Sequence, residues 1–252
     1  MRVLMFSVAL VLGLSGCASE SYIESEQLKE ASNYNAELGV AYLQQGRFEL
    51  ALSKLKKSLE QNPDNADAQH FIAELYHQIG KTSLASKHFE LAMELDPDNS
   101  MLKNNYGVFL CEQKQFEKSK KLFIEVSKDP LYSQMALLHE NIGICAKEKG
   151  DLKTAEDYLR KTLREVPNSP KSLLAMAELS FDKQDYPGSS DYLYKYLKVS
   201  RHNAASLWLG ILLAKKDNNM NRVASYSILL KGKFPDSKQA QWLKKMESKE
   251  GH

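Results

Sequence analysis

The sequence repeats itself every 34 residues, and this period constrains the fold more than any single residue does. Pro63 and Pro97 stand 34 residues apart inside two nearly identical tetrapeptides, Asn-Pro-Asp-Asn at 62–65 and Asp-Pro-Asp-Asn at 96–99. Pro167 follows 70 residues after Pro97, which is two further periods plus two residues. A fixed period of this length indicates an array of one repeated helical unit, and such arrays usually present binding surfaces.

Composition agrees with a helical array and narrows the range of partners. The 252 residues include only 12 Gly and 7 Pro, which is too few for an all-β fold with a turn every ~8–12 residues. Lys and Arg total 34 and Asp and Glu total 32, for a net charge of +2. Nucleic-acid binding normally requires a strong basic surplus, so we expect no nucleic-acid partner.

The first sixteen residues have the pattern of a secretory signal peptide. A basic start at 1–2 precedes an apolar run at 3–14, which is shorter than the ~20 residues that a membrane span needs. Leu14-Ser15-Gly16-Cys17 ends this run and resembles the bacterial lipobox, in which a Leu and two small residues precede a Cys. An uncleaved anchor with an incidental cysteine is the alternative.

The lipobox resemblance implies where the chain is cleaved and anchored. Residues 1–16 would be removed, and Cys17 would carry a diacylglyceryl group at the new N-terminus. Ala18 stands where an Asp would favour inner-membrane retention, so the resemblance implies a lipid anchor on the periplasmic face of the outer membrane. The polar and acidic segment that follows predicts a lipidated N-terminus and tether over 17–31.

Each period carries the same order of residue types. A large apolar residue is followed by Gly or Ala, then by an aromatic, a turn glycine, further small and aromatic residues, and a closing proline. This order resembles the tetratricopeptide repeat (TPR), which implies an all-α, right-handed superhelical solenoid of about six TPR helix pairs plus a C-terminal capping helix. We expect repeats at 32–65, 66–99, 100–133, 136–169, 170–202 and 203–235, within a solenoid over 32–235, and a capping helix and tail at 236–252.

The repeated residues have physical roles. Turn glycines at 46, 80 and 150 end the first helix of a repeat, because glycine adopts a left-handed conformation at least cost. Asn65 and Asn99 follow the prolines and supply caps for the next helix. The last two repeats are degenerate: Arg201 replaces a proline, and aligning repeat 6 on Gly210 requires an insertion around 217–221 to bring Ala224 and Pro235 into register.

The sequence contains no catalytic signature, so we expect no enzyme, no cofactor and no small-molecule substrate. His70, Glu74 and His77 fall at i, i+4 and i+7 and share one helical face, which is a spacing that can hold a metal. No fourth ligand is apparent, and a polar binding surface explains these residues without a metal. We therefore expect the metal to be absent.

In the TPR register, the first helix of each repeat lines a concave groove. The resemblance places a partner-binding groove, partly apolar, at Ala36, Val40, Leu43, His70, Glu74, His77, Asn104, Asn105, Val108, Asn141 and Ile144. Asn105 and Asn141 share one position in successive repeats, and paired amides of this kind hold the backbone of a bound peptide. The alternative is that they satisfy neighbouring side chains.

Cys111 and Cys145 lie on the first helices of adjacent repeats. A disulfide between them is conceivable in an oxidising compartment. Their positions within the two helices differ, so we expect their side chains to point in different directions and to be buried as free thiols.

One local stretch is more specific than the repeats. Residues 104–111, Asn-Asn-Tyr-Gly-Val-Phe-Leu-Cys, combine with the lipobox and the repeats to resemble the PilF/PilW family of type IV pilus biogenesis lipoproteins. The resemblance implies a pilotin, which binds PilQ-like secretin subunits and other type IV pilus proteins and promotes secretin localisation and multimerisation. The alternative is an outer-membrane TPR scaffold for cell-wall or envelope assembly.

Overall fold

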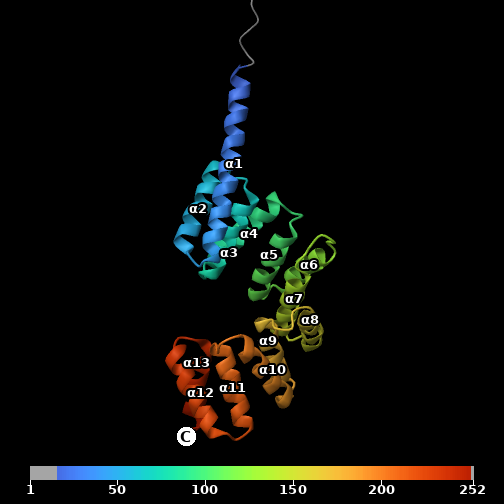
Figure 1. Cartoon of the computed structure of the whole chain (residues 1–252), viewed down its shortest axis with the longest axis vertical. Coiled ribbons are helices and arrows are strands. Elements are labelled where there is room, and N and C mark those ends of the chain that lie inside the picture. Colours follow the sequence, from blue (N-terminus) through green and yellow to red (C-terminus); the bar gives the residue numbers. More distant parts are fainter. Residues whose placement is uncertain (1–15, 251–252) are drawn as a thin grey trace, which may run out of the picture. The chain divides into compact units, whose positions relative to one another are not determined.

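A computed structural model describes residues 16–250, and side chains from 23 to 249. Within this part the chain is entirely α-helical, with thirteen helices and no strand, which confirms the predicted fold class (Figure 1). The helices are α1 (Gly16–Gln44), α2 (Phe48–Gln61), α3 (Ala66–Gln78), α4 (Thr82–Leu95), α5 (Ser100–Glu112), α6 (Phe116–Ser127), α7 (Met135–Lys149), α8 (Leu152–Glu165), α9 (Pro170–Asp182), α10 (Tyr186–Val199), α11 (Ala204–Lys216), α12 (Met220–Lys233) and α13 (Lys238–Glu250). The predicted signal peptide lies outside the described residues, except for Gly16.

Five pairs of successive helices pack together, α1/α2, α3/α4, α7/α8, α9/α10 and α11/α12, and α13 packs on α11 and α12. In a sixth pair, α5/α6, Ser119 Oγ donates to the Gly107 carbonyl and Phe123 lies against Gly107. A left-handed residue stands in the turn of every pair. Glycine fills this position at 46, 80 and 150, with φ of 71°, 73° and 86°, as the sequence predicts. Lys114, Gln184 and Asn218 adopt the same conformation, with φ of 60°, 63° and 52°. The turn therefore marks all six repeats, including the three that lack the glycine.

The turn residues correct the register of repeat 6. They are spaced by 34 residues throughout, except for 36 between Lys114 and Gly150. The extra two residues therefore lie in repeat 3 or in the connection from α6 to α7. Pro235 follows Asn218 by 17 residues, as Pro63 follows Gly46, so the predicted insertion around 217–221 does not exist. The predicted alignment took Gly210 as the small residue of repeat 6, one position too early.

Small residues let the two helices of a pair approach closely. A Cβ built on Gly39 would lie 2.5 Å from Leu55 Cγ, and one on Gly143 would lie 2.8 Å from Leu159 Cγ. Both leucines are fully buried on the second helix of their pair. Asn65 caps α3 by accepting a hydrogen bond from the backbone N–H of Ala68 at 2.9 Å, as predicted.

The chain divides after Tyr106 into two compact units, whose described parts are 16–106 and 107–250. We call them the N-terminal unit and the C-terminal unit. In the N-terminal unit, the Asn65 amide donates to Ser32 Oγ and Asn33 Oδ1, both at 2.9 Å. This buried network ties the first helix of repeat 1 to the start of repeat 2.

The C-terminal unit contains a disulfide between Cys111 and Cys145, with their Cα atoms 5.8 Å apart. The expectation of divergent free thiols is therefore wrong. Their positions, counted from the turn residue, differ by two, which is a rotation of roughly 200° around a helix. Two neighbouring helices face each other with opposite sides, so side chains that meet between them must occupy different positions.

Helix α1 runs without a break from Gly16 to Gln44. The predicted tether at 17–31 therefore lies in the same helix as the start of repeat 1. Most of its described side chains are exposed, including Ile23 and Leu28. None of the helices described here has both the length and the apolar character needed to cross a bilayer.

Candidate protein-binding surfaces

The first helices of repeats 1 and 2 form a groove of about 500 Å³, which we call the α1–α3 groove. Two predicted residues, Ala36 and Val40, line it. Its other lining residues are Asn33, Glu37, Ala41, Gln44, Asp67 and Phe71. The lining therefore contains two carboxylates and no cation, beside an apolar strip. Such a surface suits a segment that carries positive charge and an apolar side chain.

Several predicted groove residues belong to the interior, either as well as lining the groove, like Ala36, or without lining it. Ala36 and Leu43 are 4% and 7% exposed and belong to the core of the N-terminal unit, with Leu55 and Ile72. Asn104 is 1% exposed. These positions face the neighbouring helices because the α1 and α3 pairs pack closely. Val40 is half-buried, and it offers the predicted apolar surface together with Phe71, which the sequence interpretation missed.

His70, Glu74 and Asn105 form one partly buried polar cluster rather than three separate contacts. His70 Nε2 lies 3.0 Å from Glu74 Oε1, and its ring is 1% exposed. The amide of Asn105 donates to Glu74 and lies 3.2 Å from His70 Nε2. Asn105 therefore engages neighbouring side chains, which is the alternative that the sequence left open. Within the described residues, no group of three or more His, Cys, Asp or Glu is arranged to hold a metal.

The remaining predicted groove residues are partly accessible. His77, Val108, Asn141 and Ile144 are each half-buried. Val108 packs on the core around the disulfide, and Ile144 packs on the core formed by α7, α8 and α9. Their roles in binding a partner stay predictions, as does the lipid attachment at Cys17.

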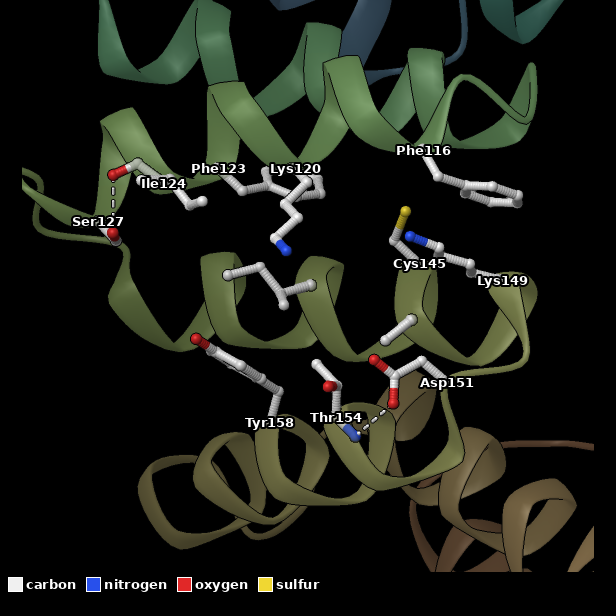
Figure 2. Close-up of a pocket in the computed structure, with 12 residues that line it drawn as sticks. Phe116, Lys120, Phe123, Ile124, Ser127, Cys145, Lys149, Asp151, Thr154 and Tyr158 are labelled. Carbon is white, nitrogen blue, oxygen red and sulfur yellow. Dashed lines mark hydrogen bonds between the residues drawn. The ribbon is translucent and has the colours of Figure 1, made fainter.

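A second groove of about 350 Å³ lies between α6, α7 and α8 in the C-terminal unit, and we call it the α6–α8 groove (Figure 2). Phe116, Phe123 and Tyr158 supply aromatic walls, and Lys120 and Lys149 lie among its lining residues. Lys149 Nζ is 2.6 Å from Glu117 Oε1, and this hydrogen bond lowers the pKa of the Glu117 carboxyl. The only acid in its lining, Asp151, caps α8 by accepting from the N–H of Thr154 at 3.1 Å.

A third groove, of about 480 Å³, follows between α8 and α10, and we call it the α8–α10 groove. Its lining contains Arg160, Arg164, Lys195 and Lys198, and no acidic residue. Glu156 lies beside it and binds both Lys183 and Arg160, and these hydrogen bonds lower the pKa of its carboxyl. The sequence interpretation missed the α6–α8 and α8–α10 grooves because it followed the first helix of each repeat. The available signal was the spacing of cations by three or four residues on α8 and α10.

Family models for the tetratricopeptide repeat match this chain at residues 42–100 and 140–169. These ranges fall on repeats 1 and 2 and on repeat 4. They agree with the sequence pattern, which is clearest in the same three repeats.

Relatives match over nearly the whole length. The type IV pilus assembly protein PilF of Pseudomonas aeruginosa is 34% identical over 238 residues, which are 92% of this chain and 94% of the relative. A solved structure of Pseudomonas aeruginosa PilF is 33% identical, with a TM-score of 0.69, and covers 87% of this chain and 99% of its own. The crystal structure of PilW, described as a widely conserved type IV pilus biogenesis factor, is 28% identical, with a TM-score of 0.72. It covers 84% of this chain and 97% of its own.

Proposed function

This chain belongs to the PilF/PilW family of tetratricopeptide type IV pilus biogenesis proteins, and we propose that it acts as a pilotin. In this role it binds secretin subunits, directs them to the outer membrane and promotes their multimerisation. The observation that carries the proposal is the 34% identity to PilF over 92% of the chain. The family resemblance of residues 104–111 supports the same role.

The N-terminal cysteine supplies the anchoring step of this proposal. Acyl chains on Cys17 would hold the protein at the membrane, because each buried CH₂ contributes about 0.8 kcal/mol. A secretin segment bound to an anchored protein is confined near the membrane surface, which raises its effective concentration for assembly. The mechanism is tethering plus binding, and it makes or breaks no covalent bond.

The three grooves supply the binding step. Each combines apolar side chains with charged side chains at its edge, as interfaces that recognise peptide segments do. The α1–α3 groove contains predicted partner-binding residues, so we assign the secretin contact first to Val40 and its neighbours.

The proposal is tested in cells that lack this protein, by measuring secretin multimers on semi-native gels and by membrane fractionation. We expect multimers to disappear and to return with the wild-type chain. Cys17→Ser is expected to give a folded protein that leaves the outer-membrane fraction and restores few multimers. Ala18→Ser is the matched control, because it changes the next residue and keeps the acceptor cysteine. Unchanged multimers in the deletion strain would exclude the pilotin role, and unchanged fractionation of Cys17→Ser would exclude the anchor.

A scaffold for cell-wall or envelope assembly would share the lipobox and the repeats. The two functions separate in a pull-down from detergent-solubilised envelopes. The pilotin proposal predicts recovery of secretin. Recovery of cell-wall enzymes without secretin would favour the scaffold.

A further inference from the structure

The α8–α10 groove combines a cationic rim with an apolar floor. Arg160 and Arg164 come from α8, and Lys195 and Lys198 come from α10. The floor includes Leu173, which is 2% exposed. Leu163 and Tyr192 also line the groove and are half-buried. A ligand must therefore enter the groove to contact the floor.

Two of the four cations lack a carboxylate partner. Arg160 is 2.7 Å from Glu156 Oε1, and Lys195 is 2.7 Å from Asp191 Oδ2. By contrast, Arg164 and Lys198 form no ion pair with the described residues. Lys198 Nζ instead lies 4.4 Å from the centre of the Tyr194 ring, which itself is 60% exposed. The groove therefore has positive charge that the surrounding residues leave uncompensated.

The repeat does not require a cation at the positions of Arg164 and Lys198. An equivalent groove between α2 and α4 is lined by Lys56, Glu60 and His88. Counted from the left-handed turn residue, Lys56 and Glu60 occupy the positions of Arg160 and Arg164. Helices α2, α4 and α6 also have no basic residue in their last turn, whereas α8 has Arg164 and α10 has Lys198. Charge at these positions is therefore free to serve binding.

We propose that the α8–α10 groove binds an acidic segment of a protein partner, which places an apolar side chain on the floor at Leu173 and Tyr192. Charge complementarity selects the acidic segment, and the 480 Å³ volume lies in the roughly 300–1,000 Å³ range of sites that enclose a ligand. A lipid headgroup layer would meet the rim cations, but it is too flat to reach the floor. The inference rests on the proposed function only in that the chain binds proteins.

The test measures the affinity of labelled probe peptides for the full chain, purified in a neutral detergent. The readout is fluorescence anisotropy. The acidic probe has four Glu residues on each side of a central Phe-Leu pair. A second probe replaces Glu by Gln, and a third replaces Phe-Leu by Ser-Ser. We expect the acidic probe to bind at least tenfold more tightly than either of the other two. Its affinity is expected to fall as salt rises, because surface charges are screened.

Charge reversal locates the site on the protein. Arg164→Glu with Lys198→Glu is expected to weaken the acidic probe at least tenfold. The matched control, Lys238→Glu with Lys244→Glu, makes the same charge change at exposed positions of α13 and is expected to change affinity less than twofold. Circular dichroism verifies that both double variants keep their helical content.

Several results would overturn the proposal. These are equal binding of the acidic and Gln probes, equal losses in the two double variants, or acidic-probe binding that survives Arg164→Glu with Lys198→Glu. Vesicles with 30% phosphatidylglycerol test whether the groove binds an anionic membrane surface. If they bind the wild-type chain, lose binding in the groove variant and displace no peptide, the groove recognises a membrane instead. None of these readouts contains secretin, so they succeed or fail independently of the pilotin role.

Discussion

The N-terminal and C-terminal units use the same backbone plan with opposite surface charge. In both, a left-handed residue closes each helix pair, and a small residue lets the two helices touch, as at Gly39 and Gly143. The α1–α3 groove of the N-terminal unit has two carboxylates and no cation in its lining, whereas the α8–α10 groove has four cations and no carboxylate. The repeat thus determines the close contacts and leaves the exposed charges free to differ between binding surfaces.

Polar networks join neighbouring repeats in both units, as where Ser169 and Ser172 donate to the buried Glu140, and the C-terminal unit adds a covalent link. The N-terminal unit uses the Asn65 network and the cluster of His70, Glu74 and Asn105. The C-terminal unit has the disulfide between Cys111 and Cys145, across the one 36-residue interval between turn residues. A covalent link therefore joins repeats 3 and 4 at the one interval that departs from the period.

The largest expected effect comes from removing that link. Changing Cys111 and Cys145 together to Ala is expected to destabilise the C-terminal unit by about 2–4 kcal/mol, because the unfolded chain regains the freedom of a long loop. Hydrogen exchange measures the loss helix by helix. We expect amides of α7 and α8 to lose protection while those of α1 to α3 keep it. Reduction of the wild-type chain breaks the same bond without a substitution and serves as the control. An equal loss of protection in both units would show that the effect of the disulfide is not confined to the C-terminal unit.

Overpacking a close contact between helices is expected to reduce stability by less than removing the disulfide does. The reduction should be similar in the two units. Gly39→Ala places a Cβ 2.5 Å from Leu55 Cγ, and Gly143→Ala places one 2.8 Å from Leu159 Cγ. Each is expected to cost about 1–3 kcal/mol, measured by urea unfolding. Gly232→Ala is the matched control, because its Cβ would meet nothing within 4 Å, and it should stabilise α12 by about 0.5–1 kcal/mol. A cost confined to one unit would show that the contact is not a property of the repeat.

The turns show how far the sequence could predict this fold. Gly46, Gly80 and Gly150 predicted three of the turns, because glycine is the residue type that most readily adopts φ > 0. Lys114 and Gln184 were missed because lysine and glutamine do not mark a left-handed turn, and Asn218 was missed although asparagine adopts this conformation more readily than most residues with a side chain. The register error in repeat 6 followed from taking Gly210 as the reference, although Pro235 already stands in register with the turn at Asn218.

The candidate surfaces were predicted less completely than the helices. The family register pointed to Ala36 and Val40, which line the α1–α3 groove, but it cannot tell a lining residue from a core residue such as Leu43. Whether a side chain is accessible depends on how closely the neighbouring repeat packs. The cysteines show the same limit, because whether two side chains meet depends on the mutual orientation of their helices.

Exchanging turn residues between the units tests whether they share the same left-handed turn. The expected changes in stability are smaller than those above. Gly80→Lys introduces a side chain at φ 73° and is expected to cost about 1 kcal/mol, since left-handed backbone is unfavourable for residues with a Cβ. Lys114→Gly relieves the same strain and is expected to stabilise the chain by up to about 1 kcal/mol. Urea unfolding of the two single variants and of the double variant measures both. A destabilising Lys114→Gly would mean that chain entropy outweighs the strain.

The smallest expected effect is a pH dependence in which both units take part. Burial lowers the pKa of His88 below its ordinary 6.5, with a further contribution from Lys87 and Lys56, and its Nδ1 lies 2.6 Å from Gln69 Oε1. Burial similarly lowers the pKa of His202 in the C-terminal unit. Between 6.5 and the lower folded value the unfolded chain binds more protons, so acidification through this window destabilises the folded chain.

His88→Gln separates the two contributions. Glutamine can still form a hydrogen bond with Gln69 but does not titrate. The Tm of the variant is therefore expected to fall less than that of the wild type between pH 7.5 and 5. The opening free energies of α3 and α4, from hydrogen exchange corrected for the intrinsic exchange rate, should become less dependent on pH, whereas those of α11 and α12, near His202, should stay as in the wild type. An unchanged pH dependence in α3 and α4 would mean that His88 stays neutral at no cost to the folded state.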